Sequence, residues 1–150
     1  MALSVERKNT SFLPDFKKVI ARFFPLDTMR TTELVMRIYY MSDEEAEMTL
    51  NQLLREFSKR HRNMTRIFNK HFNKVKYVFS DLEIDIEDLT ERKKLLIGSY
   101  FTMEYSIESA AFFNPSIVED PDQSGLEEGE RRVVMSFRAT GEGHISSLVF

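Results

Sequence analysis

The residues most able to do chemistry lie close together near the C-terminal end, in segment 136–147. This segment contains Arg138, Glu142 and His144, with a glycine on each side of Glu142. A guanidinium carries a fork of N–H donors, and a carboxylate and an imidazole beside it supply further donors and acceptors. That combination suits the vicinal diol of a sugar. The alternative is that these residues form an exposed hairpin end, which is polar because it faces water and not because it binds a ligand.

The strongest run of positive charge lies at 55–76. Its basic residues are Arg55, Lys59, Arg60, Arg62, Arg66, Lys70, Lys74 and Lys76, and Glu56 is its only acid. A nucleic-acid surface could use this run if Phe68 and Phe72 stacked on bases. These two rings, however, share a helical stripe with apolar neighbours, which indicates a core face. The net charge of −3 also differs from that of strongly basic nucleic-acid-binding domains. We therefore expect no nucleic-acid partner. The basic run is expected to be a solvated face or an interface with the acidic segments 81–91 and 119–130.

Composition excludes several classes of protein. The 150 residues are 42% apolar and include no Cys, so we expect a folded domain without a disulfide scaffold, a thiolate metal site or a cysteine nucleophile. His61 and His71 are ten positions apart and have no carboxylate at a zinc-like offset, so we expect no metal and no cofactor. No apolar run approaches the roughly 18 residues of a membrane span. The N-terminus also lacks the apolar core of a signal peptide, so we expect a cytoplasmic protein without a membrane partner.

Hydrophobic periodicity predicts a mostly helical first part of the chain. We expect two short strands or extended arms before Pro25, and helices over 28–40, 42–57, 63–81 and 91–111. Ser42 and Glu45 have the spacing of a capping box at the start of the second helix. The fourth helix is apolar around most of its circumference and should be the central, most buried element. We expect Asn114 and Pro115 to end it, because a residue before proline is pushed out of helical geometry.

After Pro115 the sequence has the pattern of a sheet. Strands are expected over 116–119, 132–138 and 144–150, with a polar loop at 120–130 and a turn at 139–143. Three strands with two open edges do not make a stable sheet alone. We therefore predict an α+β chain with a helical extension over 1–112 and the start of a larger domain over 113–150. The chain ends on an apolar strand without a turn or polar tail, so we expect it to be cut inside that domain.

Two segments of this predicted sheet carry a family resemblance. Segment 113–118, Phe-Asn-Pro-Ser-Ile-Val, and segment 135–147, Met-Ser-Phe-Arg-Ala-Thr-Gly-Glu-Gly-His-Ile-Ser-Ser, resemble the opening of the catalytic domain of glycoside hydrolase family 130. This family contains mannoside phosphorylases and related mannosidases. Segments 57–63 and 97–106 also resemble the N-terminal helical extension of one subgroup. The resemblance implies a five-bladed β-propeller, whose first blade begins in 113–150 and whose central pocket binds the non-reducing mannose.

The resemblance also assigns residues to that pocket. Asn114 and Arg138 match first-blade residues that hydrogen-bond the sugar, and Ser116, Glu142 and His144 lie at the same pocket mouth. The family's catalytic aspartate and its phosphate-binding residues belong to later blades, so no catalytic residue is expected here. The implied partners of the whole enzyme are a mannose-containing oligosaccharide and inorganic phosphate. We expect this chain to be inactive by itself and to form a homo-oligomer through its helices. A helical homo-oligomeric interaction module without any link to catalysis is the alternative.

Overall fold

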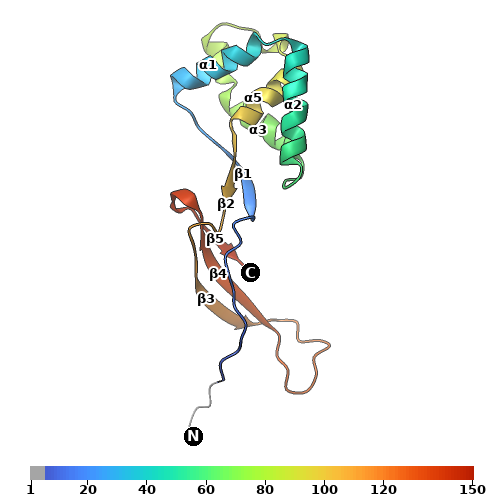
Figure 1. The fold of residues 1–150 in the computed structure, drawn as a ribbon, viewed down its shortest axis with the longest axis vertical. Coiled ribbons are helices and arrows are strands. Elements are labelled where there is room, and N and C mark those ends of the chain that lie inside the picture. The colour runs from blue at the N-terminus through green and yellow to red at the C-terminus, as the bar shows by residue number, and fades with distance from the viewer. Residues whose placement is uncertain (1–5) are drawn as a thin grey trace. The chain divides into compact units, whose positions relative to one another are not determined.

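The computed structural model describes residues 6–150 and is α+β (Figure 1). The chain divides into two compact units. The helical unit is Val19–Tyr105, and the strand unit is 106–150 together with the N-terminal residues up to Lys18. In the described residues no strand precedes Val19, so the first expected arm has no regular secondary structure from residue 6 onward. Residues 1–5 of that arm lie outside the described residues.

Most of the helical unit follows the predicted elements. Its helices are α1 (Thr28–Tyr39), α2 (Asp43–Phe57), α3 (Met64–Val75), α4 (Tyr77–Asp81), the 3₁₀ turn η1 (Ile86–Asp88) and α5 (Glu91–Tyr100). The capping box is confirmed, because Ser42 Oγ accepts from the backbone N–H of Glu45 and that carboxylate accepts from the backbone N–H of Ser42. Asp27 and Thr90 cap α1 and α5 in the same way with one side-chain oxygen each.

The core of the helical unit forms around α5, which contacts α1, α2 and α3 (Figure 1). Leu96 and Ile97 of α5 are fully buried, together with Phe68 of α3 and Val35 of α1. Phe68 and Phe72 therefore belong to the core stripe, as predicted, and have no free face for a base to stack on. The helical amphipathicity of α1 to α3 is thus satisfied by packing on one central helix.

The prediction of a single helix from 91 to 111 is wrong. The helix ends at Tyr100, and β2 (Thr102–Ser106) follows and pairs with β1 (Val19–Phe23). Thr102 marks the change, because its Oγ1 donates to the carbonyl oxygen of Gly98 at 2.8 Å and so satisfies a carbonyl of the last helical turn. Apolar residues on all sides are equally compatible with a buried helix and with a strand. The choice here depends on β1, a partner that is distant in sequence.

Asn114 and Pro115 do not end a helix but lie inside β3 (Ala111–Glu119) of the strand unit. That strand pairs with β4 (Val133–Thr140), which pairs with β5 (Ser146–Val149), so the order is β3-β4-β5 and both pairs are antiparallel. Between Phe113 and Ser116 the register shifts by one residue, which places two residues opposite one. This is a β-bulge, and Pro115 is tolerated in it because β3 is an edge strand and the bulge needs no N–H there.

The C-terminal end of α4 offers a test of backbone strain. Glu83 has a φ of 57°, and the N–H groups of Glu83 and Ile84 donate to the carbonyls of Ser80 and Phe79. This is the Schellman pattern, in which glycine is the usual residue at the left-handed position. We expect Glu83→Gly to raise the free energy of unfolding by about 0.5–1 kcal/mol, because the left-handed conformation costs roughly 1–2 kcal/mol with a Cβ.

Urea unfolding followed by circular dichroism at 222 nm measures this change. The matched control is Glu33→Gly, an exposed position within α1 where glycine should lower the free energy of unfolding by about 1 kcal/mol. The same change in sequence thus has opposite expected signs at the two positions. A loss of stability at both of them would contradict the strain at Glu83.

Candidate functional site

Arg138 is at the centre of a polar and aromatic surface on the strand unit. Its partners in the β-ladder are Phe113 on β3 and Leu148 on β5. The guanidinium carbon lies 5.5 Å from the centre of the Phe113 ring, and Nε donates to Ser146 Oγ at 3.1 Å. Ser146 Oγ is also 3.4 Å from Thr140 Oγ1. We call the surface formed by Phe113, Arg138, Thr140 and Ser146 the Arg138 face.

The opposite face of the same sheet is apolar and partly covered. Phe112 stacks on Phe137 with their ring centres 4.5 Å apart, and the N-terminal Phe12 lies 5.1 Å from Phe137. A cavity of about 540 Å³ remains between this face and the segment around Phe12. Because side chains alternate between the faces of a strand, this packing fixes the Arg138 face as the side that is open to a ligand.

The bulge determines how Asn114 is presented next to Arg138. Asn114 has a φ of 52°, in the left-handed region that few residues other than glycine and asparagine adopt. It directly follows Phe113, the ladder partner of Arg138, and regular pairing resumes with Ser116 opposite Ser136. Bulges of this kind re-aim a side chain and are frequent next to functional sites. The ladder thus places Asn114, Ser116 and Arg138 on neighbouring positions of two strands.

The remaining two predicted site residues lie on the turn after β4. Glu142 is exposed in the short 3₁₀ turn η2 (Glu142–His144), and the side chain of His144 lies outside the described part of the chain. The sequence prediction omitted Phe113, Thr140 and Ser146, which complete the Arg138 face. Phe113 could have been found from its position beside Asn114. The hydroxyls could not, because their place depends on the pairing of β4 with β5.

Two histidines of the helical unit are held by partners that explain them structurally. His61 Nε2 is 2.8 Å from Glu104 Oε1, and Arg60 donates to both oxygens of the same carboxylate at 2.8 and 2.7 Å. The hydrogen bonds from Arg60 and, to a lesser extent, from His61 lower the pKa of Glu104. His71 is buried, with Nδ1 2.7 Å from Thr102 Oγ1. Among the described side chains, which do not include that of His144, no group of three histidine or acidic residues could hold a metal ion.

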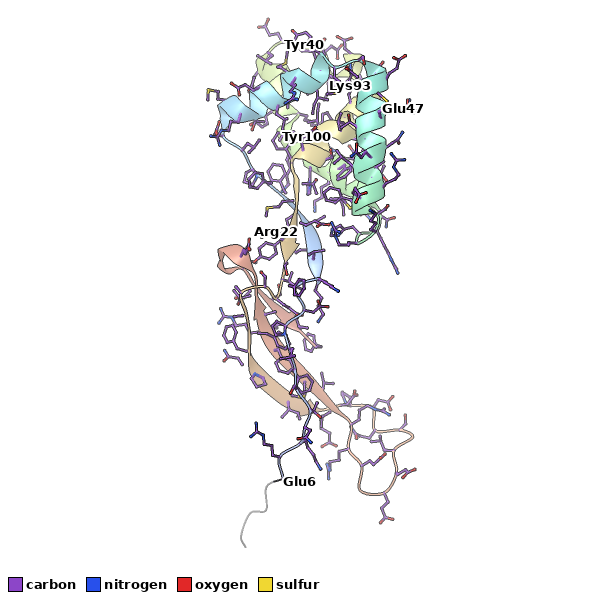
Figure 2. The ribbon with its side chains drawn as sticks, in the orientation of Figure 1. Glu6, Arg22, Tyr40, Glu47, Lys93 and Tyr100 are labelled. Atoms are coloured by element: carbon purple, nitrogen blue, oxygen red, sulfur yellow. The ribbon has the colours of Figure 1, made fainter. Side chains whose placement is uncertain are left out.

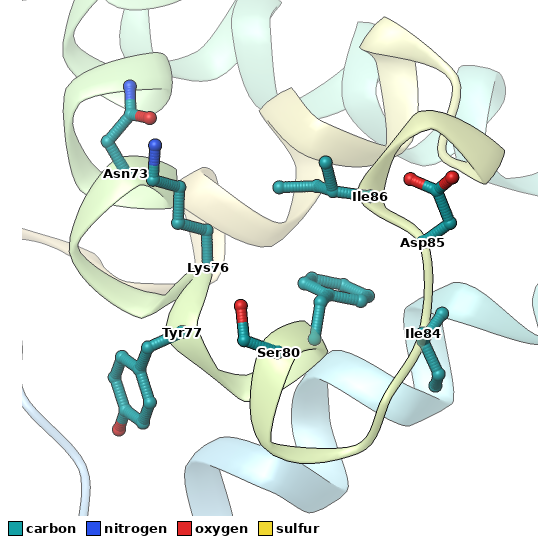
Figure 3. A pocket seen from close by; sticks show the side chains of 8 residues that line it. Asn73, Lys76, Tyr77, Ser80, Ile84, Asp85 and Ile86 are labelled. Atoms are coloured by element: carbon teal, nitrogen blue, oxygen red, sulfur yellow. The ribbon is translucent and has the colours of Figure 1, made fainter.

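A cavity of about 600 Å³ lies beside α3, α4 and η1 in the helical unit (Figure 3). Its apolar part is formed by Phe79, Ile84 and Ile86, and Asn73 and Asp85 lie on its polar rim. Lys76, Tyr77 and Ser80 line it as well. Asn73 and Asp85 bond the backbone: Asn73 donates to the carbonyl of Asn69, and Asp85 accepts from the N–H of Glu87. These two hydrogen bonds stabilise the helix and the η1 turn locally. We therefore consider this cavity a weaker site candidate than the Arg138 face.

Among the described residues, no helix has the length and apolar character needed to cross a membrane. Comparison of the chain with models of protein families, with curated proteins and with solved structures finds no match in any of the three. The site must therefore be interpreted from its own residues and geometry.

Proposed function

We propose that this chain contributes part of the mannose-binding pocket of a β-mannoside phosphorylase or hydrolase and is inactive by itself. Two observations support the proposal. Segments 113–118 and 135–147 resemble the opening of the family 130 catalytic domain, which would make β3 to β5 the first blade of a β-propeller. The ladder also places the two residues that match sugar-binding positions, Asn114 and Arg138, beside each other. The geometry of Asn114 at a left-handed bulge next to Arg138 carries the most weight.

The chemistry of the Arg138 face fits a hexose. The guanidinium offers paired N–H donors to two neighbouring hydroxyls, and mannose presents its 2- and 3-hydroxyls on the same side of the ring. The amide of Asn114 can both donate and accept. Phe113 supplies an aromatic face for the C–H groups of the sugar, and Ser146 Oγ holds Nε of Arg138 in place at 3.1 Å. Each polar group therefore has a role in binding rather than in bond cleavage.

The same surface does not contain the groups for glycosyl transfer. Inverting transfer needs a general acid at the leaving oxygen and an activated water or phosphate on the opposite side of the sugar. The Arg138 face, as described, presents a cation, two hydroxyls and a phenyl ring but no carboxylate. The catalytic aspartate of the family also matches no position of this sequence. Mannose binding without turnover is thus the activity proposed for the chain alone.

Sugar binding is tested by titrating the isotope-labelled chain with β-1,4-mannobiose and following the backbone amides by NMR. We expect saturable shifts at Asn114, Arg138 and Ser146, and no release of mannose 1-phosphate when phosphate is added. Arg138→Met should weaken binding by about 10-fold or more, because it removes charged hydrogen-bond donors and keeps a similar length.

The control for this titration is Arg131→Met, which removes an exposed arginine that pairs with Glu119 in the same unit, 3.0 Å away. It should leave the affinity for mannobiose within about twofold of the wild type. The proposal would be refuted by wild-type amides that do not shift, or by equal affinities of the Arg138 and Arg131 variants. Turnover by the chain alone would refute the statement that it is inactive.

We also propose that the helical unit forms a homo-oligomer, which is the alternative function if the sugar does not bind. Large apolar side chains remain exposed on and beside α1 and α2: Met29 at 67%, Tyr40 at 77% and Met48 at 65%. Tyr40 and Met48 line the same surface hollow, and contiguous exposed apolar groups mark protein–protein contacts. Sedimentation equilibrium of the wild type and of Tyr40→Ser/Met48→Ser tests this function. A monomeric wild type at high concentration would contradict it.

A further inference from the structure

A separate cavity of the helical unit is surrounded by positive charge. It measures about 450 Å³ and is lined by Arg22, Phe23, Pro25, Lys70, His71 and Lys74. Arg22 is on β1 (Figure 2), and the two lysines are one turn apart on α3. Residues four apart lie on the same side of a helix, so cations from two elements converge on one opening. We call this the cationic pocket.

Within the described part of the chain, no acidic side chain pairs with the cations of the cationic pocket. None of Arg22, Lys70 and Lys74 forms an ion pair with another described residue, although Lys59 and Arg60 nearby in sequence do. Two of the three are instead placed over aromatic rings. The ammonium of Lys74 lies 4.5 Å from the centre of the Phe23 ring, and the guanidinium carbon of Arg22 lies 4.8 Å from that of Tyr105. A ring orients a cation and leaves its N–H donors available.

His71 lies in the wall of the cationic pocket, and its protonation state decides whether it adds to the positive charge. Burial is the main cause that lowers the pKa of His71, and the charges of Lys74 and Lys70 lower it further. Thr102 Oγ1 donates its proton to Gly98, so it must accept from Nδ1–H of His71. His71 therefore serves as a neutral wall of the pocket, and the positive charge belongs to the three long side chains.

We propose that the cationic pocket binds a phosphate group, either as inorganic phosphate or as part of a small phosphorylated molecule. A dianion is the ligand that best compensates three cations with no carboxylate among them. The planar fork of Arg22 matches two phosphate oxygens, and the lysines act as point charges toward the third. A volume of about 450 Å³ also leaves room for a substituent of sugar size. The site lies wholly in the helical unit and is independent of mannoside binding.

The test is an NMR titration of the full chain with sodium phosphate and with glucose 6-phosphate, each against sodium chloride of equal ionic strength. We expect saturable shifts of the amides of Lys70, His71 and Lys74 with a phosphate compound and not with chloride. Saturation by phosphate alone identifies the free ion as the ligand, and tighter binding of glucose 6-phosphate identifies a phosphorylated molecule. Both results support the proposal.

Lys70→Gln/Lys74→Gln should weaken phosphate binding by about 10-fold or more. The matched control is Arg62→Gln/Arg66→Gln, which also removes two positive charges from the basic run but at positions outside the pocket. Its affinity for phosphate should stay within about twofold of that of the wild type. Circular dichroism verifies that both variants fold. Equal shifts with chloride would overturn the proposal, as would equal weakening by both double variants. The proposal would also be overturned if a single-stranded oligonucleotide bound at the cationic pocket and phosphate did not compete with it.

Discussion

Gly98→Ala is expected to lower the free energy of unfolding of the helical unit by about 3 kcal/mol or more. A Cβ at Gly98 would lie 1.9 Å from the backbone oxygen of Phe68 and 2.6 Å from its carbonyl carbon. Those atoms belong to the backbone of α3 and cannot rotate away as a side chain would. The added methyl group must therefore push α5 away from α3, and both helices carry fully buried side chains of the core.

The sign of this effect separates packing from helix propensity. By propensity alone, alanine inside a helix is more stable than glycine by about 1 kcal/mol. Urea unfolding at 222 nm measures the change, with Ser99→Ala as the control in the same helix. Ser99 is buried and donates to the carbonyl of Leu96 at 2.7 Å, so its loss should cost only about 1 kcal/mol. A Gly98→Ala chain as stable as the wild type would show that α3 and α5 do not meet at this glycine.

The parts of the fold that the sequence predicts are those decided by local chemistry. The capping box at Ser42, the cap at Thr90 and the apolar stripes of α1 to α3 are all read from residues a few positions apart. The stretch after Tyr100 is different, because its conformation depends on pairing with β1 about eighty residues earlier. Periodicity contains no information on such a partner, and the helix is therefore predicted one strand too long.

The candidate site shows the same division. Residue types alone point to Arg138, Glu142 and His144, and only the family resemblance adds Asn114 beside Arg138. The bulge at Asn114 and Pro115 could not be predicted, because proline before a strand and proline within an edge strand look alike in sequence. The cationic pocket is a similar case. Lys70 and Lys74 belong to a visible basic run, but only the packing of β1 against α3 brings Arg22 to them.

Lys18→Met is expected to lower the free energy of local opening of the N-terminal segment of the strand unit by about 2–3 kcal/mol. The Glu108 side chain has no exposed surface, and its Oε1 is 2.7 Å from Lys18 Nζ. Its Oε2 accepts from the N–H of Asp15 at 2.6 Å, and the N–H of Ile107 donates to the carbonyl of Lys18. A buried carboxylate that has lost its cation destabilises the folded state more than the removal of both charges does. The free energy spent on taking the carboxylate out of water is then no longer offset by attraction to a cation.

Hydrogen exchange at the amides of Ile107 and Lys18 measures this loss, and about 30- to 100-fold faster exchange is expected in Lys18→Met. The double variant Lys18→Met/Glu108→Met should recover most of the protection, since it removes the buried charge as well. Arg131→Met breaks the exposed pair with Glu119 in the same unit and should change exchange by less than about threefold. Equal effects of Lys18→Met and Arg131→Met would mean that burial adds nothing to the pair. If all three variants behave as predicted, Glu108 is the residue that anchors the N-terminal segment. This anchor keeps Phe12 against Phe137 and leaves the Arg138 face open on the other side of the sheet.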